Sequence, residues 1–341
     1  MRADPLVSVI ILNYNGKKFL EVLIPSLLRQ TFTFFETIVV DTGSTDDSLQ
    51  FLSQYSRSIM TLSCSINSFS AGNNAGIRKS RGKYVLTLNN DVELQEDFLQ
   101  KLVAVAEKSS SGVGMWASKI LNYYERATID SAGLAMYGDG ISRGRGRMQK
   151  DDGRFDAEEE VFFPSGCAGL YRKVMLDAIG LFDEDFEFFL EDSDLGLRGR
   201  LAGWKCIYVP EARVYHMYSS TIGKYSARKA FLVERNRVWL VAKLFSPSLI
   251  FLSFLYTGLR YGYQVYGVFS KKGSAAKLAD NVSKMSVVGI VLKAWFFALL
   301  GLPRMFKKRK TLSNYTRITH GQRVDLLKRF SMSAHELSLA E

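Results

Sequence analysis

The feature that most constrains the fold of this sequence is an alternation of short apolar runs with amphipathic stretches over residues 6–117. The amphipathic stretches cover about 18–30, 45–56, 70–80 and 95–108. Strands that alternate with helices in this way form βαβ units with parallel strand pairing. We therefore predict an α/β fold with a mostly parallel central sheet flanked by helices. The runs that would form its strands are VSVIIL (7–12), ETIVVD (36–41), IMTLSC (59–64), KYVLTL (83–88) and GVGMWA (112–117).

Polar residues follow three of these predicted strands. Asn13 and Asp41 end the first and second strands, and the next polar group ends the fourth: Asn89, Asn90 and Asp91. Ligands of such sheets bind in a crevice at the carboxyl ends of the strands. We expect these polar strand ends to line one crevice.

The two carboxylates in this group each allow a structural and a functional interpretation. Asp41 leads into a Gly-Ser turn, where it either caps the next helix or accepts hydrogen bonds from a nucleotide base or ribose. Asp91 ends a buried strand, where a carboxylate is costly unless it is paired or binds a cation. It either closes an Asx turn or binds a hard divalent cation, which needs few protein oxygens when a diphosphate supplies others.

A second polar group lies in FFLEDSDLGLR, a predicted helix. Asp194 and Arg198 are four residues apart on one helical face, which predicts a structural ion pair. Glu191 and Asp192 precede them at the helix N-terminus, where carboxylates also complement the helix dipole. Alternatively, Asp192 projects into the crevice as a general base that removes a proton from an attacking hydroxyl.

His216 follows a short predicted strand at 206–209 and lies among aromatic residues. A lone histidine here is either a buried structural residue or, if the carboxylates bind a cation, a further ligand. The chain lacks GxxxxGK[ST], a GxGxxG after the first strand, GxSxG and HExxH, which argues against the enzyme classes that use them. Its three histidines and three scattered cysteines argue against structural zinc and for a reducing compartment.

Together, these segments resemble the family 2 glycosyltransferases, which have a GT-A (Rossmann-like) fold, and in particular their rhamnosyltransferase-like and galactofuranosyltransferase-like members. The resemblance covers about residues 6–237 and rests on seven motifs in the family's order. They are VSVIILNYNG, VVDTGSTD, SAGNNAGI, LTLNND, SGCAGLYRK, the segment from IGLFDEDFEFFLEDSD to PEARVYH, and ERNR.

The resemblance implies a role for each candidate residue. Asp41 and the backbone around Asn13 would bind the base and ribose of a nucleotide sugar, and residues 166–169 would line the donor and acceptor. Asp192 would be the general base, with Glu191 beside it at the acceptor. The remaining positions would bind the diphosphate and a divalent cation, Mg²⁺ or Mn²⁺: Asn73 and Asn74 near the diphosphate, Asp91 as metal ligand with Asn89 and Asn90 beside it, and His216 completing the metal site.

One position departs from the family pattern. The metal-binding motif of the family often begins with Asp, whereas this chain has Asn89 there. One carboxylate fewer is expected to weaken cation binding. It also suggests the alternative that the chain is a non-catalytic GT-A scaffold that binds a sugar nucleotide without turnover.

The excess positive charge lies in the C-terminal part of the chain. Residues 246–341 contain 15 Lys and Arg against four Asp and Glu, an excess that equals the formal net charge of the whole chain, +11. A basic segment indicates an anionic partner, either nucleic acid or acidic lipid. We expect no nucleic-acid binding, because the aromatic residues lie in apolar runs rather than between basic residues.

Two apolar stretches, at 249–269 and 286–303, each contain one charge, Arg260 and Lys293. Each has roughly the 20 residues needed to cross a bilayer, so a transmembrane hairpin is one alternative. The basic loop between them and the cost of a mid-membrane cation, about 2.5–3.5 kcal/mol, disfavour it. We favour a pair of interfacial helices, and a homo-oligomer interface without lipid is the third alternative.

We therefore expect a catalytic domain at 1–245 and a basic, apolar helical tail at 246–341. The predicted function is inverting transfer of a sugar from dTDP-rhamnose or a UDP-sugar to a lipid-linked or glycan acceptor, in cell-surface polysaccharide synthesis. Because the N-terminus lacks a signal-peptide pattern and the tail is apolar, we expect a peripheral enzyme at the cytoplasmic face of the cell membrane.

Overall fold

The structure is a computed structural model that describes residues 4–218, 225–281 and 284–339. The chain divides into two compact units. The first comprises Met1–Leu134, Gly144–Arg200 and Trp204–Tyr218, and the second comprises Ala135–Arg143, Leu201–Gly203 and Ser219–Glu341. The predicted functional boundary after residue 245 stays a prediction.

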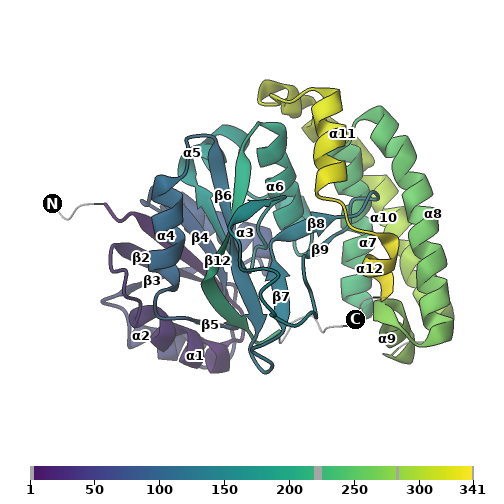
Figure 1. The fold of residues 1–341 in the computed structure, drawn as a ribbon. Coiled ribbons are helices and arrows are strands. Elements are labelled where there is room, and N and C mark those ends of the chain that lie inside the picture. Colours follow the sequence, from purple (N-terminus) through teal and green to yellow (C-terminus); the bar gives the residue numbers. More distant parts are fainter. Residues whose placement is uncertain (1–3, 219–224, 282–283, 340–341) are drawn as a thin grey trace. The chain divides into compact units, whose positions relative to one another are not determined.

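The first unit is built on one mixed sheet (Figure 1). Its strands run in the order β10-β12-β6-β11-β4-β1-β2-β3, with β5 beside β12 and β7 beside β6. Strands β1 to β4 are mutually parallel, as is the β6–β12 pair, which confirms the predicted α/β fold. The strands are β1 (Val7–Asn13), β2 (Phe35–Asp41), β3 (Ile59–Ser63), β4 (Tyr84–Asn89), β5 (Val92–Leu94), β6 (Val113–Asn122), β7 (Ile129–Ala132), β10 (Glu159–Val161), β11 (Ala168–Arg172) and β12 (Lys205–His216).

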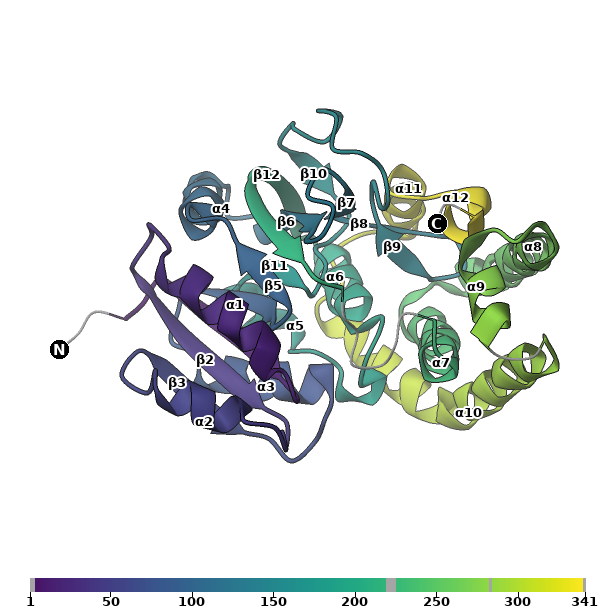
Figure 2. The same cartoon turned by 90° about the horizontal axis from the view of Figure 1, so that it is seen from below.

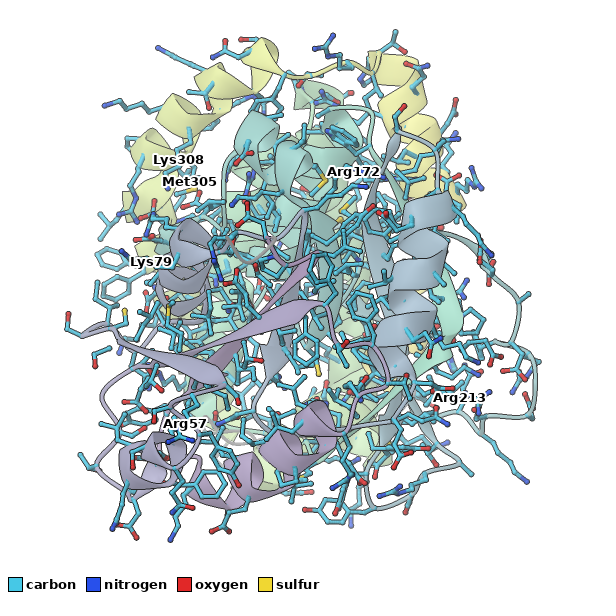
Figure 3. All side chains as sticks on the ribbon, turned by 90° about the vertical axis from the view of Figure 1, so that its left-hand side faces the viewer. Arg57, Lys79, Arg172, Arg213, Met305 and Lys308 are labelled. Carbon is cyan, nitrogen blue, oxygen red and sulfur yellow. The ribbon has the colours of Figure 1, made fainter. Side chains whose placement is uncertain are left out.

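Two strands differ from the sequence-based expectation. β11 is antiparallel to both β4 and β6 and separates them. β12 is longer than the predicted strand at 206–209. Its register against β6 shifts between Val209 and Arg213, a residue labelled in Figure 3, and the strand then continues to His216. Pro210 lies within this shift, where a residue without an N–H interrupts the ladder. The continued strand carries His216 to the edge where the candidate residues lie.

Helices flank the sheet on both faces (Figure 2). They follow the predicted amphipathic segments closely. In α1, for example, Leu20, Leu23, Ile24 and Leu27 recur at helical spacing and are fully buried. The helices of this unit are α1 (Lys17–Leu28), α2 (Ser48–Ser53), α3 (Phe69–Lys79), α4 (Phe98–Lys108), α5 (Lys173–Ile179) and α6 (Glu191–Leu201), with a 3₁₀ turn, η1 (Glu184–Phe186).

The second unit is helical, which confirms a helical C-terminal region. The long helices α7 and α10 pack side by side, and the indole of Trp239 donates a 2.9 Å hydrogen bond to the Ala298 carbonyl. A short pair of strands, β8 (Leu134–Met136) and β9 (Ser142–Gly144), brackets the 135–143 segment of this unit. The helices are α7 (Ala227–Leu244), α8 (Pro247–Ser270), α9 (Gly273–Asn281), α10 (Lys284–Lys310), α11 (His320–Arg329) and α12 (Ala334–Leu339), with η2 (Thr311–Asn314).

A buried ion cluster lies in the second unit and determines where Arg260 points. The Arg260 guanidinium donates to Asp139 at 2.6 Å and to Glu234 at 2.9 Å, and Glu234 also pairs with Arg237. Burial alone would raise the pKa of Glu234, but the charges of Arg260 and Arg237 outweigh it and lower the pKa to about 2. The apolar stretch at 249–269 therefore turns its single cation toward protein carboxylates.

Helices α8 and α10 also expose many large apolar side chains. In the described residues one helical span, Met285–Asn314, is long and apolar enough to cross a membrane, with mean hydropathy 2.1 and only 11% of its apolar window buried. The stretch containing α8 does not meet this criterion. The most exposed side chains are Phe251, Phe254, Leu255, Leu259, Val265, Tyr266 and Phe269 on α8, and Met285, Val288, Leu292, Phe296, Leu299 and Leu300 on α10.

Candidate active site

Asn13 and Asp41 end neighbouring parallel strands in register, as predicted. Asp41 is buried, and its carboxylate accepts hydrogen bonds from the Asn13 amide at 2.9 Å and the Ser44 hydroxyl at 2.6 Å. It also accepts from the backbone N–H groups of Gly43 and Ser44. Asp41 thus closes the turn after β2, and the same contacts fix the orientation of its carboxylate at the end of the strand.

Asn90 links the end of β4 to this group by donating a 2.8 Å hydrogen bond to the Asn13 side chain. The contact requires a glycine at position 16. A Cβ at Gly16 would lie 2.1 Å from Asn90 Nδ2 and 2.4 Å from Asn13 Oδ1, closer than atoms can approach. The predicted nucleotide side of the crevice is therefore one connected polar network.

Asp91 and His216 lie beside each other because β5 pairs with β12 opposite Val92. His216 Nε2 is 3.3 Å from Asp91 Oδ1, and His216 Nδ1 is 2.8 Å from Asp130 Oδ2. Burial alone would lower the pKa of His216, but the two carboxylates raise it to about 10. The two predicted metal ligands, which are 125 residues apart in the sequence, are thus brought together by the pairing of β5 with β12.

The chemistry of this pair suits a divalent cation that also binds a diphosphate. Within residues 4–218, 225–281 and 284–339, no three His, Cys, Asp or Glu side chains are grouped as a complete cation site. Mg²⁺ and similar cations bind through one or two protein ligands when substrate phosphates and water supply the rest. One carboxylate and one imidazole fit that requirement, with Asn89 next to them at the end of β4.

Asp192 lies in the first turn of α6, after a loop with a strained backbone. Glu187, Phe189 and Leu190 all have φ between 57° and 66°, in the left-handed region that non-glycine residues rarely adopt. The Asp192 carboxylate accepts a 3.1 Å hydrogen bond from the Gly166 N–H. Burial raises its pKa against the hydrogen bonds that lower it. A raised carboxylate pKa is the property that a general base needs.

Glu191 is buried next to Asp192, and its Oε2 atom has no hydrogen-bond partner in the described part of the chain. Burial and the charge of Asp192 raise its pKa well above the usual range. The neighbouring Asp194 instead forms the predicted ion pair, 2.8 Å from Arg198. Asp194 therefore has a structural role in α6, which its ion pair explains. Glu191 and Asp192 are left as the carboxylates that could take part in chemistry.

The Gly166–Cys167 segment connects the candidate base with the candidate metal ligands. Gly166 donates to Asp192, and the Cys167 carbonyl accepts from the Asn89 N–H at 2.9 Å. Burial raises the pKa of the Cys167 thiol, and the charges of Asp91, Asp130 and Asp192 raise it further. The end of β4, two residues before Asp91, and the candidate base Asp192 therefore both bond to this segment.

The two asparagines of α3 lie in different surroundings. The Asn73 amide donates to the Phe69 carbonyl, and its oxygen is buried without a partner in the described residues. The Asn74 amide donates to the Phe182 carbonyl and to Glu184, and it accepts from the Phe182 N–H. Asn74 thus fastens α3 to the loop before α6, and a nucleotide contact for either residue stays a prediction.

Asp130 and Arg147 lie at the site but were not found from the sequence. Arg147 donates a 2.7 Å hydrogen bond to the Asp130 oxygen that does not face His216. The segment that contains them lacks hydrophobic periodicity, and the contact to His216 spans 86 residues. The signal that could have found them is the IDSAG sequence after β6, where a carboxylate follows an apolar residue in a short strand.

The mixed sheet with its flanking helices defines a GT-A-type fold, and the candidate residues lie at the ends of its strands. The family profile described as "Glycosyl transferase family 2" matches residues 8–180, about half of the chain. The chain belongs to glycosyl transferase family 2.

Curated relatives match over most of the chain but are mainly longer proteins. The chain is 30% identical over 243 residues to the uncharacterized protein y4gI of Sinorhizobium fredii, covering 65% of this chain and 26% of y4gI. It is 25% identical to the O-antigen biosynthesis protein RfbC of Myxococcus xanthus, covering 73% of this chain and 20% of RfbC. It thus spans about a quarter or less of the length of these two relatives.

Solved structures share the fold at low sequence identity. A structure of GalNAc-T7 with UDP, GalNAc and Mn²⁺ superposes with a TM-score of 0.60 at 16% identity, covering 77% of this chain and 51% of that one. Staphylococcus aureus TarS in complex with UDP gives 0.52 at 18% identity, covering 91% and 89%. Mannosyltransferase PcManGT from Pyrobaculum calidifontis, with GDP-Man and Mn²⁺, gives 0.52 at 16%, covering 92% and 86%.

Proposed function

We propose that this chain transfers a sugar from a nucleotide-sugar donor to an acceptor hydroxyl in the synthesis of a cell-surface polysaccharide. The observation that carries the proposal is that the end of β4 links three candidate groups. Asn90 bonds to the Asn13–Asp41 network, Asp91 faces His216, and Asn89 bonds to Cys167, next to the Gly166 that holds Asp192. The printed role of the relative RfbC in O-antigen biosynthesis supports the polysaccharide context.

The donor is a nucleoside diphosphate sugar, with dTDP-rhamnose or a UDP-sugar as the candidates that the sequence resemblance implies. Structures that share the fold hold UDP or GDP-Man, and two of them hold Mn²⁺. Asp41 and Asn13 would bind the nucleoside. Asp91 and His216 would hold Mg²⁺ or Mn²⁺. Four asparagines would lie near the nucleoside or its diphosphate: Asn73, Asn74, Asn89 and Asn90. The bound cation would neutralise the departing diphosphate.

The acceptor hydroxyl loses its proton to Asp192 as it attacks the anomeric carbon from the face opposite the leaving group. This displacement inverts the anomeric configuration. The raised pKa of Asp192 favours proton uptake, and the Gly166 N–H holds the carboxylate in place. Glu191, which is buried, would lie beside Asp192 at the acceptor.

The second unit supplies the proposed membrane attachment. The exposed apolar faces of α8 and α10 suit insertion among lipid acyl chains, and the cations near the end of α10 suit anionic headgroups. The burial of Arg260 against Asp139 and Glu234 supports an interfacial α8, because spanning would take these carboxylates into lipid with it. A peripheral enzyme at the cytoplasmic membrane face would act on a lipid-linked or glycan acceptor.

Asn89 favours one alternative, a GT-A scaffold that binds a sugar nucleotide without transfer. A panel of nucleotide sugars incubated with the full chain, Mn²⁺ or Mg²⁺ and membrane lipid separates the two. A transferase releases nucleoside diphosphate and labels a lipid or glycan acceptor, with both signals lost in Asp91→Ala. Nucleotide binding without release of diphosphate from any donor would establish the scaffold instead.

A further inference from the structure

His216 is placed between two carboxylates, one for each ring nitrogen. Nε2 faces Asp91 and Nδ1 faces Asp130, at 3.3 Å and 2.8 Å. A neutral imidazole that binds a cation must carry its proton on the other nitrogen. With a cation bound at Asp91, the ring keeps one proton. The Asp130 carboxylate can only accept a hydrogen bond, so it would hold that proton on Nδ1 and leave the Nε2 lone pair for the cation.

The backbone places Asp130 for this contact. In the β6–β7 ladder, Ile120 pairs with Ser131 and the next residue, Leu121, pairs with Ile129. The register therefore shifts by one residue at Asp130, as in a β-bulge. Bulges of this kind redirect a side chain next to functional sites. Here the redirected carboxylate reaches the imidazole of β12, on the far side of β6.

Arg147 fixes the orientation of the Asp130 carboxylate. Its guanidinium donates to Oδ1 at 2.7 Å while Oδ2 faces His216, so each oxygen has a separate function. The same guanidinium stacks over the Tyr218 ring, with its central carbon 4.5 Å from the ring centroid, and Tyr218 packs edge-on to His216. The carboxylate cannot rotate without losing a charged hydrogen bond that is largely shielded from water.

We propose that Asp130, oriented by Arg147, is a positioning residue that sets the tautomer of His216 and thereby makes Nε2 a cation ligand. The inference rests on the proposed donor site. It adds a carboxylate that hydrogen-bonds to the metal-binding histidine on the ring nitrogen that does not face the cation. Partners of this kind typically contribute about 10- to 100-fold to metal affinity.

Arg147 makes the Asp130→Asn variant a sharp test. Arginine is a donor only, so it selects the oxygen of the new amide and turns the NH₂ group toward His216. A donor facing Nδ1 requires a lone pair there, which moves the ring proton to Nε2. The variant should therefore invert the tautomer with almost no change in side-chain size. Asp130→Asn combined with Arg147→Met frees the amide to rotate and should restore part of the original tautomer.

The experiment measures two properties of the full chain with UDP present. Nitrogen NMR of its three histidines, with Mg²⁺ and with His216→Gln to assign the signal, reports which nitrogen of His216 carries the proton. Electron paramagnetic resonance reports Mn²⁺ affinity. Asp152→Asn, at an exposed carboxylate paired with Arg154, is the matched control. We expect Nδ1 protonation in the unmodified chain, its loss in Asp130→Asn with about 10- to 100-fold weaker Mn²⁺ binding, and partial recovery in the double variant.

Three results separate failure of this inference from failure of the proposed function. An unmodified chain with the proton on Nε2, or an Asp130→Asn variant that binds Mn²⁺ like Asp152→Asn, overturns the role of Asp130 and leaves the transferase intact. Equal Mn²⁺ binding by the unmodified chain and Asp91→Ala instead removes the metal site from the proposed function. The tautomer of the unmodified chain decides the inference even if a variant does not fold.

Discussion

Asp192 is the residue on which the proposed chemistry depends most directly. Its carboxylate is half-buried, is held by the Gly166 N–H and has a raised pKa. Replacement by Asn keeps the shape but removes the proton acceptor. We expect Asp192→Asn to lower kcat by about 10²–10⁴-fold, the usual contribution of general base catalysis, with UDP affinity unchanged. Steady-state transfer rates and calorimetric UDP binding measure the two quantities.

Asp177→Asn provides the control for this prediction, because Asp177 is an exposed carboxylate on α5. It should leave both quantities unchanged. Normal turnover in Asp192→Asn would remove Asp192 as the base, whereas a parallel loss of UDP affinity would indicate a structural role instead.

Individual residues show how far sequence could predict the site. Asp41 and Asp91 were predictable because each ends a buried strand, where a carboxylate needs a partner. The contacts of Asn74 and Asp130 were not predictable, because they depend on segments distant in the chain. Asn74 bonds to residue 182, and Asp130 reaches His216 only through the bulge in β7.

At the scale of secondary structure, the long periodic elements were predictable and the short antiparallel ones were not. Helices α1, α3 and α4 follow the amphipathic pattern to within a few residues. β5 and β7 have three and four residues and carry no periodic signal of their own. β5 pairs with an edge of β12, and β7 pairs with an edge of β6. These edges exist only once the sheet has assembled, so the sequence of the short strands does not reveal them.

Helices α7 and α8 are joined by the buried ion cluster, which yields a stability prediction. Arg260→Leu would leave Asp139 and Glu234 with Arg237 as the remaining cation of the cluster. Removing one partner of a buried ion pair typically costs about 3–5 kcal/mol. We expect a loss of that order in the free energy of unfolding, measured by urea denaturation. Arg228→Leu, at an exposed position of α7, should change it by less than about 0.5 kcal/mol. Equal stability of the two variants would contradict a stabilising cluster.

The same cluster predicts acid sensitivity. The pKa of Glu234 is lowered from 4.5 to about 2 in the folded chain. A carboxylate with a depressed folded pKa stabilises fully above its unfolded pKa and loses that contribution as the pH falls through the folded value. The window is therefore from about pH 4.5 down to about pH 2. Urea denaturation across this range should show a shallower fall in stability for Glu234→Gln than for the unmodified chain. Parallel curves would show that Glu234 is not paired.

At the scale of the whole molecule, charge and apolar surface are concentrated in the same part of the chain. Residues 246–341 carry the entire formal charge excess. Their two long apolar helices leave most of their large side chains exposed. Sequence could predict this coincidence but not which face of α8 is covered, because Asp139 and Glu234 reach Arg260 from outside the tail. Surface of this composition is costly in water and is stabilised by an anionic lipid interface.

Single charges on the exposed face of α10 test the membrane assignment. Leu292 and Leu300 are 66% and 63% exposed, so Leu292→Glu and Leu300→Glu should leave the fold intact. Because burying a leucine is worth about 1.5–3 kcal/mol, each should lower partitioning into vesicles of mixed neutral and anionic phospholipid by about tenfold or more. Val174→Glu, at a 64% exposed position of α5, is the matched control. Unchanged vesicle binding in the α10 variants would refute insertion of this face. The alternative is that this face joins copies of the chain. In that case the unmodified chain does not bind vesicles and sediments as an oligomer, and these variants dissociate the oligomer.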